Sequence, residues 1–550
     1  MIPGSRGPRY GVLAIAALAA ILSVVDARRD GATADEPLHV AGSVALARYG
    51  SWAVIVEHPP LSKALYGAAA LAAGARDEPP LSYRDLFRSA RAQLFAGRPG
   101  VPRDRVLLAV RGAATGVFVL LILAAAGAAG SPEAALLAAA LVAGQTALFP
   151  HGHLATTDLP ATLAIVLAVW ATAAFASKAT ALRFFAAALA AGAALAAKQT
   201  ALVLLPLLPL LVVPSILSAP AGEERRRRVT GAVLLPISAI VVLALLLRPV
   251  SAGDPPGTLA LLARIHRLSP DDTRRALVVE RLDRGLGRYA LATLFVARQT
   301  EVGRRTYFLG TVTTSAPRSY HLVAVLVKSP LAWLLLVGAG LSFALRRGSP
   351  ERGRLLVAAA ALCFLSALGG PKIGVRHVFP AVVLASAGAA SALAPALSRH
   401  GRRALVAATL LALSPLAFGR ALGRFGASAR LFPSPPLADS NLDWGQDLPR
   451  LAELARQRGI PPSSLGVAYF GGDLPSLRIP GCVDLLEADA SLPRYVAVSR
   501  QLLLVGPETA LFAEGRSRAA RVVAELKARD AGFVARAGDS IDLFELPPPR

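Results

Sequence analysis

The sequence predicts an all-α polytopic membrane protein that carries a small soluble α/β domain at its C-terminal end. Of its 550 residues, 54% are hydrophobic and only 17% are charged, and the mean hydropathy is +0.52. Soluble domains are markedly less apolar. The apolar runs, rich in Ala, Leu and Val, reach the roughly 20 residues that a helix needs to cross a bilayer. Because only helices and closed barrels can span a membrane, we expect these runs to be helices.

We expect about 11 transmembrane helices from these runs. The first, near residues 10–25, follows Arg6 and Arg9 as a signal peptide would. No small-residue cleavage site follows it, so we interpret it as a retained helix. The other expected spans cover residues 105–129, 133–149, 159–177, 182–197, 200–218, 229–248, 320–345, 355–369, 376–397 and 404–419.

The charge of the chain fits a membrane topology better than nucleic-acid binding. The formal net charge is +24, but the basic residues cluster in short loops between apolar runs rather than along one soluble face. If the N-terminus is cytoplasmic, the clusters at 225–228 and 399–403 also face the cytoplasm. Four polar segments then share the opposite, outer face: residues 26–104, 151–158, 249–318 and the region after about 420.

Three stretches on the outer face have helix-like spacing. Residues 38–49 and 61–71 lie in the first outer loop, and residues 264–289 are rich in Arg and Leu. We expect helices here that lie flat at the membrane interface, because such segments combine an apolar and a polar face.

The composition changes near residue 420. We therefore expect a transmembrane domain over residues 1–420 and a soluble α/β domain over residues 421–550, on the outer face. The expected strands and amphipathic helices of this second domain are strands at 465–471, 495–505 and 539–546 and helices at 448–457 and 519–529.

An acidic pair, Asp35 and Glu36, directly follows the first span. A carboxylate there can accept a proton from a hydroxyl that attacks a sugar carbon, which is the role of a general base. The alternative is a solvated acidic loop without a task. His39 lies three residues past Glu36, on the same face of a helix if this segment is helical.

The string HisProProLeu at 58–61 joins a rigid turn to two potential cations, His58 and Lys63. A diproline turn fixes the direction of its side chains, and cations there would suit a phosphate. A simple helix start, with Pro in the first turn, is the alternative. The two interpretations are compatible.

The string HGHLATTD carries His151, His153 and Asp158, which could form a metal or polar cluster. Capping is the alternative, with Thr157 or Asp158 starting a helix. The two cysteines show neither a CxxC motif nor zinc spacing, and Cys363 lies in an apolar run, so we expect no disulfide with Cys482.

Several cations interrupt apolar runs: Lys198, Lys328, and Arg376 with His377. An isolated charge in lipid is costly, so these residues are candidates for function, although side chains that reach the interface would also explain them. The string DSNLDWGQDL, residues 439–448, contains Asp443 and Trp444. Asp443 or Asp447 could cap the helix that follows, or Trp444 with the neighbouring acids and amides could form a wall that faces carbohydrate.

Together these strings resemble the GT-C superfamily of polyprenyl-phosphate-sugar-dependent glycosyltransferases, in particular the protein O-mannosyltransferase-like family 39. Asp35 and Glu36 are similar to its acidic pair in the first outer loop. HisProProLeu with Lys63 resembles its HPPLGK string, with Ser62 in place of glycine. Related lipid A aminoarabinose transferases have Lys where His58 stands, which favours the mannosyltransferase-like branch. Strings similar to those of bacterial relatives are HGHLATTDLP, GAALAAKQTALVLLP, LVKSPL, GVRHVFP and SNLDWGQDL.

The resemblance implies an inverting transfer of a sugar from a polyprenyl phosphate, with no cofactor, nucleotide sugar or metal required. It implies Asp35 as the general base, with Glu36 helping to place a substrate. The leaving phosphate would be neutralised by His58, Lys63, Lys198, Arg376 and His377. The substrate cavity would be lined by His39, His153, Asp158, Asp443 and Trp444. The MIR domains of eukaryotic relatives are absent, so a protein, a lipid and a glycan all stay open as acceptors.

Two other classes of protein remain alternatives: a transporter or flippase of lipid-linked sugars, and a structural scaffold for envelope assembly. Transporters tend to place ionisable groups near the midplane and to show repeats, whereas the motifs here gather at one face and no repeat is visible. A scaffold would leave the charges within the apolar runs without a role. The usage of Ala, Arg and Gly is compatible with a GC-rich bacterial genome, which would make the outer face periplasmic and the membrane the bacterial inner membrane.

Overall fold

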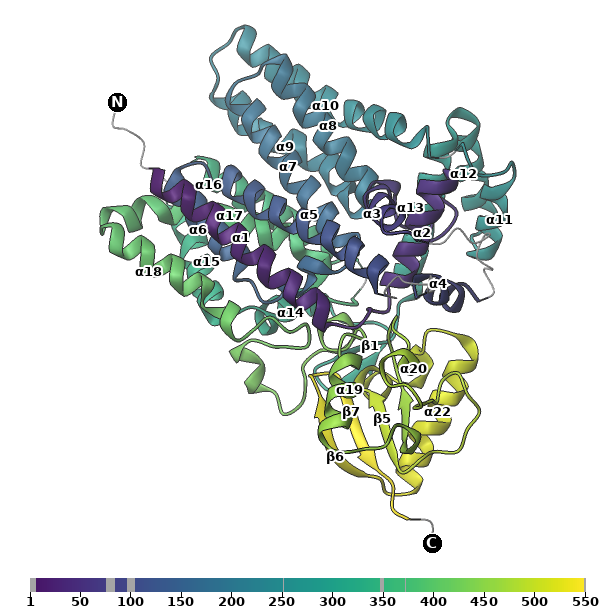
Figure 1. The fold of residues 1–550 in the computed structure, drawn as a ribbon. Helices are drawn as coiled ribbons and strands as arrows, with labels where there is room; N and C mark the ends of the chain where they lie inside the picture. The colour runs from purple at the N-terminus through teal and green to yellow at the C-terminus, as the bar shows by residue number, and fades with distance from the viewer. Residues whose placement is uncertain are drawn as a thin grey trace.

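The computed structural model describes residues 6–75, 85–95, 104–250, 252–346, 351–370 and 372–548. Figure 1 shows a large helical body with an α/β region, in yellow-green and yellow, packed against one end of it. Helices of the body that follow the expected apolar runs are α1 (Arg6–Arg29), α5 (Arg105–Ala129), α6 (Pro132–Ala143), α7 (Asp158–Ser177), α8 (Ala181–Ala197), α9 (Leu204–Ser218), α10 (Glu223–Leu247), α14 (Tyr320–Lys328), α15 (Leu331–Ala344), α16 (Glu351–Ala367), α17 (Phe379–Arg399) and α18 (Arg402–Leu413).

These helices make the chain a multi-pass membrane protein, but they do not confirm the expected number of spans. Within the described residues, 6 helices are long and apolar enough to cross a membrane, or up to 7 if the bent pair α14–α15 is one span. Helices α6 and α8 are apolar but shorter. Each expected run contains helix, but the helices in the runs 133–149 and 404–419 end early, at Ala143 and Leu413. Several of the helices are too short to cross a bilayer alone.

The expectation of one continuous span over residues 320–345 is wrong. The chain bends by 119° between helices α14 and α15. The break falls at Ser329 and Pro330, because proline cannot donate the backbone hydrogen bond that would continue the helix and disfavours a helical residue before it. Lys328, the last residue of α14, contacts the segment that follows α18: its Nζ donates to three backbone carbonyls, those of Leu422, Arg424 and Asn441, at 2.7, 2.6 and 2.7 Å.

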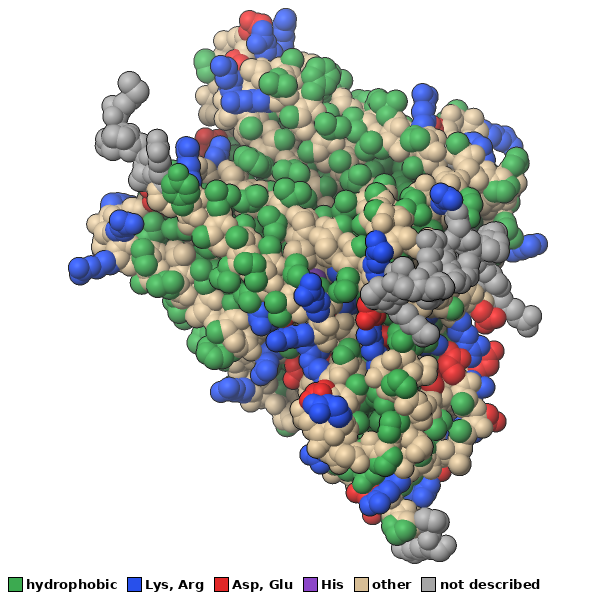
Figure 2. All heavy atoms as spheres, viewed as in Figure 1, with side chains coloured by type: hydrophobic (Ala, Val, Ile, Leu, Met, Phe, Trp, Pro, Cys, Tyr) green, Lys and Arg blue, Asp and Glu red, His purple; other side chains and the backbone are tan. Residues whose placement is uncertain are grey.

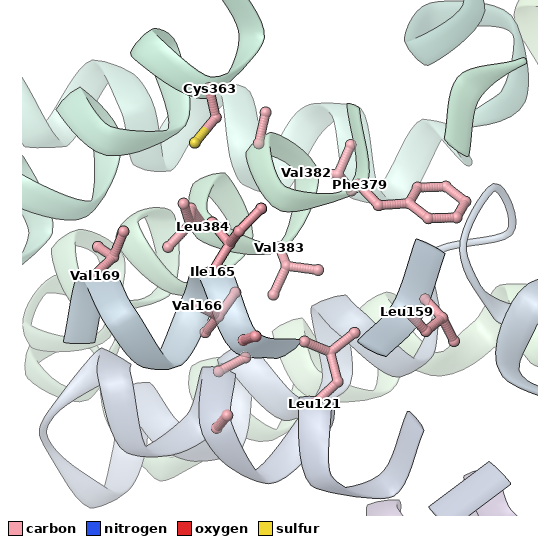
Figure 3. Packing of buried hydrophobic residues seen from close by; sticks show 14 of the residues in the cluster. Leu121, Leu159, Ile165, Val166, Val169, Cys363, Phe379, Val382, Val383 and Leu384 are labelled. Atoms are coloured by element: carbon pink, nitrogen blue, oxygen red, sulfur yellow. The ribbon is translucent and has the colours of Figure 1, made fainter. Parts of the chain in front are cut away.

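The core of the body lies where α5, α7 and α17 pack together. Figure 3 shows Leu121 from α5, Ile165 and Val166 from α7, and Val383 from α17 in mutual proximity. Each of these side chains is at most 1% exposed. Abundant alanine between them lets the helix backbones approach closely.

Apolar side chains also cover the outside of the body. On α10, Val233, Ile237 and Leu245 are 64%, 56% and 56% exposed. Figure 2 shows hydrophobic side chains spread over the helical body, while charged side chains gather at its ends and over the α/β region. Such an outer surface suits contact with lipid.

The first outer loop contains the two expected helices, α2 (Glu36–Tyr49) and α3 (Pro60–Ala72), together with α4 (Leu86–Leu94). The single helix expected over residues 264–289 is wrong. It is replaced by α11 (Thr258–Ile265), α12 (Pro270–Leu282) and α13 (Arg284–Val302). Two capping side chains start the new helices: Ser269 Oγ accepts from Asp272 N at 3.1 Å, and Asp283 Oδ1 accepts from Leu286 N at 2.8 Å.

The α/β region contains a five-stranded sheet of order β4-β3-β5-β7-β6. Strands β4 and β5 run parallel to β3, whereas β7 runs antiparallel to β5 and β6. Its elements are β3 (Leu465–Ala468), β4 (Val483–Asp484), β5 (Tyr495–Ser499), β6 (Gly532–Ala537), β7 (Ile541–Glu545), α19 (Leu448–Gln457), α20 (Pro475–Arg478), α21 (Arg500–Leu504) and α22 (Ala513–Ala528). The three expected strands are present, but the second half of the stretch 495–505 is helix α21. Both cysteines are free.

The helical body also contains several short elements, and side-chain contacts join the four outer segments. The short elements include the hairpin of β1 (Thr306–Phe308) and β2 (Thr311–Thr313) and the 3-10 helices η2 (Phe149–His153), η3 (Gln199–Val203) and η4 (Val375–Val378). Ser51 Oγ of the first loop donates to Asp254 Oδ1 at 2.5 Å. Asp30 lies 3.1 Å from His153 of η2 and 2.7 Å from Arg450 of α19. The segments predicted to share a face therefore share one end of the molecule.

Candidate active site

A cavity of about 410 Å³ opens at the end of the helical body that faces the α/β region. Its walls come from the first outer loop, the start of α7, η3, the end of α13 and the loop before α17. Of the residues expected at the site, the cavity is lined by Asp35, His39, His58, Asp158, Lys198, Arg376 and His377. Seven residues from four separate segments of the chain thus converge on one space.

Asp35 forms an ion pair with Arg376 at the edge of this cavity. Arg376 Nη1 donates to Asp35 Oδ2 at 2.9 Å, and the Asp35 side chain is still 37% exposed. Burial alone would raise the pKa of Asp35, but the positive charge of Arg376 outweighs burial and the net pKa is lowered. Asp35 is therefore an ionised carboxylate that faces the cavity.

Arg376 lies between two carboxylates. Its Nη1 is 3.7 Å from Asp158 Oδ2, and Asp158 Oδ1 is 2.5 Å from Lys198 Nζ. Asp158 is 2% exposed and the Arg376 side chain 10% exposed. Two cations and two acids thus alternate along one wall, with the Nε of Arg376 buried and without a hydrogen-bond partner among the described residues. This arrangement leaves donor groups for an anionic ligand.

Three histidines line the same space. The rings of His39 and His58 meet edge to face with centroids 4.7 Å apart, and His58 Nδ1 lies 3.2 Å from Thr157 Oγ1. Burial lowers the pKa of His39 to about 4 and that of His58 well below its usual value. Both imidazoles are therefore neutral at pH 7, which corrects the expectation that His58 is a cation. His377 has two ring nitrogens without a partner among the described residues.

Two residues expected at the site have other contacts. Lys63 is 1% exposed and donates to the backbone carbonyls of Val54 and Ile55 at 2.7 and 2.9 Å. Burial lowers its pKa to about 7. Glu36 is fully buried against Arg111, whose Nε and Nη2 lie 2.9 and 2.7 Å from its two carboxylate oxygens. The structure therefore does not bring Lys63 and Glu36 into the cavity; both hold the first outer loop in shape.

The remaining three residues lie behind the cavity. His153 contacts Asp30, as described above. Although burial alone would raise the pKa of Asp30, the hydrogen bond with His153 and nearby positive charges lower it to about 2. Asp443 accepts from the backbone amides of Gln501 and Gly445 at 3.0 and 3.1 Å. Trp444 is 2% exposed and lies under Arg376. None of the three lines the cavity.

The capping expected near these residues is also different. Thr157 and Asp447 precede α7 and α19, but neither side chain caps its helix. Thr157 contacts His58 instead. Asp447 Oδ2 accepts from Asp539 N at 2.9 Å and Ser540 Oγ at 2.8 Å. Among the described residues no group of three His, Cys, Asp or Glu side chains could hold a metal ion.

Sequence reasoning missed several residues of the site. The cavity is also lined by Glu57, Gln199, Gln299, Arg304 and Lys372. Glu57 stands beside His58 in the sequence, and its Oε2 is buried without a partner among the described residues. Arg111, like Lys198, is a lone charge in an apolar run. The same pattern could therefore have identified Arg111 from the sequence.

Residues 53–231 match the family model described as dolichyl-phosphate-mannose-protein mannosyltransferase. The crystal structure of ArnT from Cupriavidus metallidurans bound to undecaprenyl phosphate matches 98% of this chain and 98% of that chain, with 13% identity and a TM-score of 0.50. The chain therefore shares the fold of this ArnT structure over nearly its whole length. The resemblance inferred from the motifs is thereby confirmed.

The other similarities are weaker. The S. cerevisiae protein O-mannosyltransferase Pmt1–Pmt2 complex bound to the sugar donor matches 44% of this chain and 33% of that chain, with 18% identity and a TM-score of 0.33. The archaeal oligosaccharyltransferase AglB from Archaeoglobus fulgidus matches 90% and 70%, with 14% identity and a TM-score of 0.46. No curated protein matches the sequence. The matched family segment contains His58, Asp158 and Lys198, whereas Asp35 and Arg376 lie outside it.

Proposed function

We propose that this protein is an inverting glycosyltransferase of a bacterial inner membrane. It moves a sugar from a polyprenyl-phosphate carrier to an acceptor hydroxyl on the periplasmic side. The observation that carries the proposal is the ionised Asp35 carboxylate, which faces a cavity whose opposite charges, Arg376 and Lys198, suit a phosphate. The GT-C fold and the match of residues 53–231 to a mannosyltransferase family support it.

The reaction follows from this geometry. The acceptor hydroxyl attacks the anomeric carbon of the donor, and Asp35 takes the hydroxyl proton. The bond between that carbon and the phosphate oxygen breaks, and its electron pair leaves with the phosphate. Arg376 and Lys198 neutralise the charge that develops on the phosphate, and the neutral imidazole of His58 and the ring nitrogens of His377 supply hydrogen bonds. The lipid-linked sugar is a substrate, and the proposal includes no cofactor or metal.

Because Asp35 and Arg376 form an ion pair, binding of the donor changes the basicity of Asp35. A donor phosphate that engages Arg376 competes with Asp35 for the guanidinium, which lies 2.9 Å from the carboxylate. Weakening that pair removes the interaction that lowers the Asp35 pKa. Donor binding therefore prepares the base for the acceptor.

A transporter of lipid-linked sugars is the second candidate, because the bent pair α14–α15 resembles the discontinuous helices of transporters. The end of α14 at this break, however, is satisfied by the chain itself: the carbonyl of Val327 accepts from Gly426 N at 2.7 Å, and that of Lys328 accepts from Thr146 Oγ1 at 2.8 Å. No substrate is needed to satisfy it. We therefore favour the transferase.

Proteoliposomes that contain the full chain and a polyprenyl-phosphate sugar test the proposal. A transferase releases polyprenyl phosphate only when an acceptor is present, and it does so with EDTA in the buffer. A transporter moves the intact lipid-linked sugar across the bilayer without an acceptor. Analysis of lipids and glycans in a deletion strain identifies both substrates: the lipid-linked sugar accumulates while its acceptor stays unmodified.

A further inference from the structure

The segment of residues 439–447, which we call the clamp segment, connects the α/β region to both partners of the Asp35–Arg376 pair. On the Asp35 side, the carbonyl of Trp444 accepts from Ala34 N at 2.8 Å, and the carbonyl of Gln446 accepts from Gly31 N at 2.9 Å. Ala34 directly precedes Asp35. The clamp segment therefore fixes the backbone from which the carboxylate projects.

The same segment holds the Arg376 side of the pair. The guanidinium carbon of Arg376 lies 4.3 Å from the centre of the Trp444 ring. Asn441 Oδ1 accepts from Val375 N at 3.0 Å, directly before Arg376, and Ser440 Oγ donates to the carbonyl of Ile373 at 2.8 Å. A guanidinium stacked on an indole ring is attracted to the π face and loses rotational freedom.

The α/β region holds the clamp segment from behind. In open α/β sheets, ligands usually bind beyond the carboxyl ends of parallel strands. Here that position, beyond β3 and β5, is occupied by the chain itself. Asp443 accepts from Gln501 N at 3.0 Å, and Gln501 Oε1 accepts from Asp439 N at 2.9 Å. The crevice that could take a separate ligand is thus used for internal support.

Close backbone packing reinforces this support. Gly445 has a φ of +96°, and a Cβ on it would lie 2.4 Å from the Cα of Gly471, in the loop after β3. Only glycine fits such an approach. That loop also contacts the first outer loop, because Gly472 N donates to the carbonyl of Ala32 at 3.0 Å. The sheet, the clamp segment and the loop before Asp35 form one continuous contact.

We propose that the α/β region serves as a scaffold for the active site and that Trp444 is its principal positioning residue. Through its ring and its carbonyl, Trp444 sets the distance between the base Asp35 and the phosphate-binding Arg376. The role of Trp444 in turnover rests on the proposed transferase function. The contact with Arg376 can be tested without it.

Kinetics of Trp444→Leu and Trp444→Phe test the role in turnover. Leu fills part of the space but offers no π face, so we expect kcat to fall by about tenfold or more, as misplacement of reacting groups does. We also expect the acidic limb of the pH–rate profile to move to higher pH, because Arg376 is no longer held beside Asp35. Phe keeps a ring under the guanidinium and restores most of the rate and the profile.

Trp333→Leu is the matched control. Trp333 is also buried, at 5% exposure, and donates to Ser386 Oγ at 3.0 Å within the helical body, outside the cavity. We expect it to lose stability while keeping the pH–rate profile of the wild type. A folded Trp444→Leu protein with wild-type kcat and profile would overturn the proposal, as would Phe being no better than Leu.

A double-mutant cycle in thermal stability tests the contact between Trp444 and Arg376 independently of the proposed transferase function. Tm is measured for Trp444→Leu, Arg376→Gln and the double variant, with no substrate. Positioning requires the Tm losses to be smaller together than their sum, because the second substitution removes a contact that is already lost. Additive losses overturn the positioning role. If coupling is found but the wild type transfers no sugar, the proposed function fails and the scaffold contact stands.

Discussion

Arg376 Nη1 donates to Asp35 Oδ2 at 2.9 Å across a separation of 341 positions in the sequence. The carboxylate proposed as the base and the guanidinium proposed to bind phosphate are therefore in direct contact. Asp35 stays ionised because the positive charge of Arg376 lowers its pKa. Among the described residues, the Nε of Arg376 has no hydrogen-bond partner. The consequences of this contact can be measured.

Arg376→Gln is expected to weaken donor binding. The substitution removes a positive charge from the cavity but keeps a shorter side chain that can still donate a hydrogen bond. We expect donor affinity or the rate of phosphate departure to fall by about 10- to 100-fold, whereas acceptor KM stays near the wild-type value. Titration with donor and steady-state kinetics give both numbers. Arg274→Gln, at an exposed position of α12, is the control, and a change confined to acceptor KM contradicts the phosphate role.

Arg111→Gln is expected to act on folding rather than chemistry. Both side chains of its ion pair with Glu36 are 0% exposed, so the substitution leaves a buried carboxylate without its counter-charge. Breaking such a pair costs about 3–5 kcal/mol of stability. Thermal unfolding in detergent checks the loss against Arg105→Gln, at an exposed position of the same helix. Equal Tm values for the two variants would argue against the structural role of Glu36.

Stability is expected to fall as the pH decreases below about 6.5, in part through His39. Burial lowers the pKa of His39 from 6.5 to about 4 in the folded protein. Between these values the unfolded chain binds a proton that the folded chain does not, so the contribution of His39 is complete above pH 6.5 and is lost toward pH 4. His39→Gln has no such titration. A curve of Tm against pH should therefore be flatter for His39→Gln than for the wild type; parallel curves would contradict the shift.

The helical body and much of the cavity wall could be predicted from the sequence. Apolar runs report burial or lipid contact directly, and charges within them, such as Lys198 and Arg376, are costly enough to indicate a site. The sequence could not determine where helices end. Pro330 divides an apolar run into two helices. Ser269 and Asp283 start new helices within the stretch 264–289, where a single helix was expected. Local caps and breaks compete there with a continuous hydrophobic pattern.

The distribution of roles within the motifs also depends on tertiary structure. Glu36 is adjacent to Asp35 in the sequence, yet it points to Arg111 while Asp35 faces the cavity. Lys63 satisfies two carbonyls within its own loop. The sequence suggests Trp444 as part of a wall that faces carbohydrate, whereas its contact with Arg376 joins residues from separate regions of the chain. No local pattern carries that information.

The central claim is that Asp35 removes the proton from the acceptor. The direct test is Asp35→Asn in proteoliposomes supplied with a polyprenyl-phosphate sugar and acceptor, with donor binding measured in parallel. The amide keeps the size of the side chain but cannot act as the base, so transfer should fall by about 100- to 10,000-fold while donor affinity stays within a few-fold of the wild type. Asp271→Asn, at an exposed position of α12, should transfer normally. Transfer by Asp35→Asn at a near wild-type rate would contradict the account.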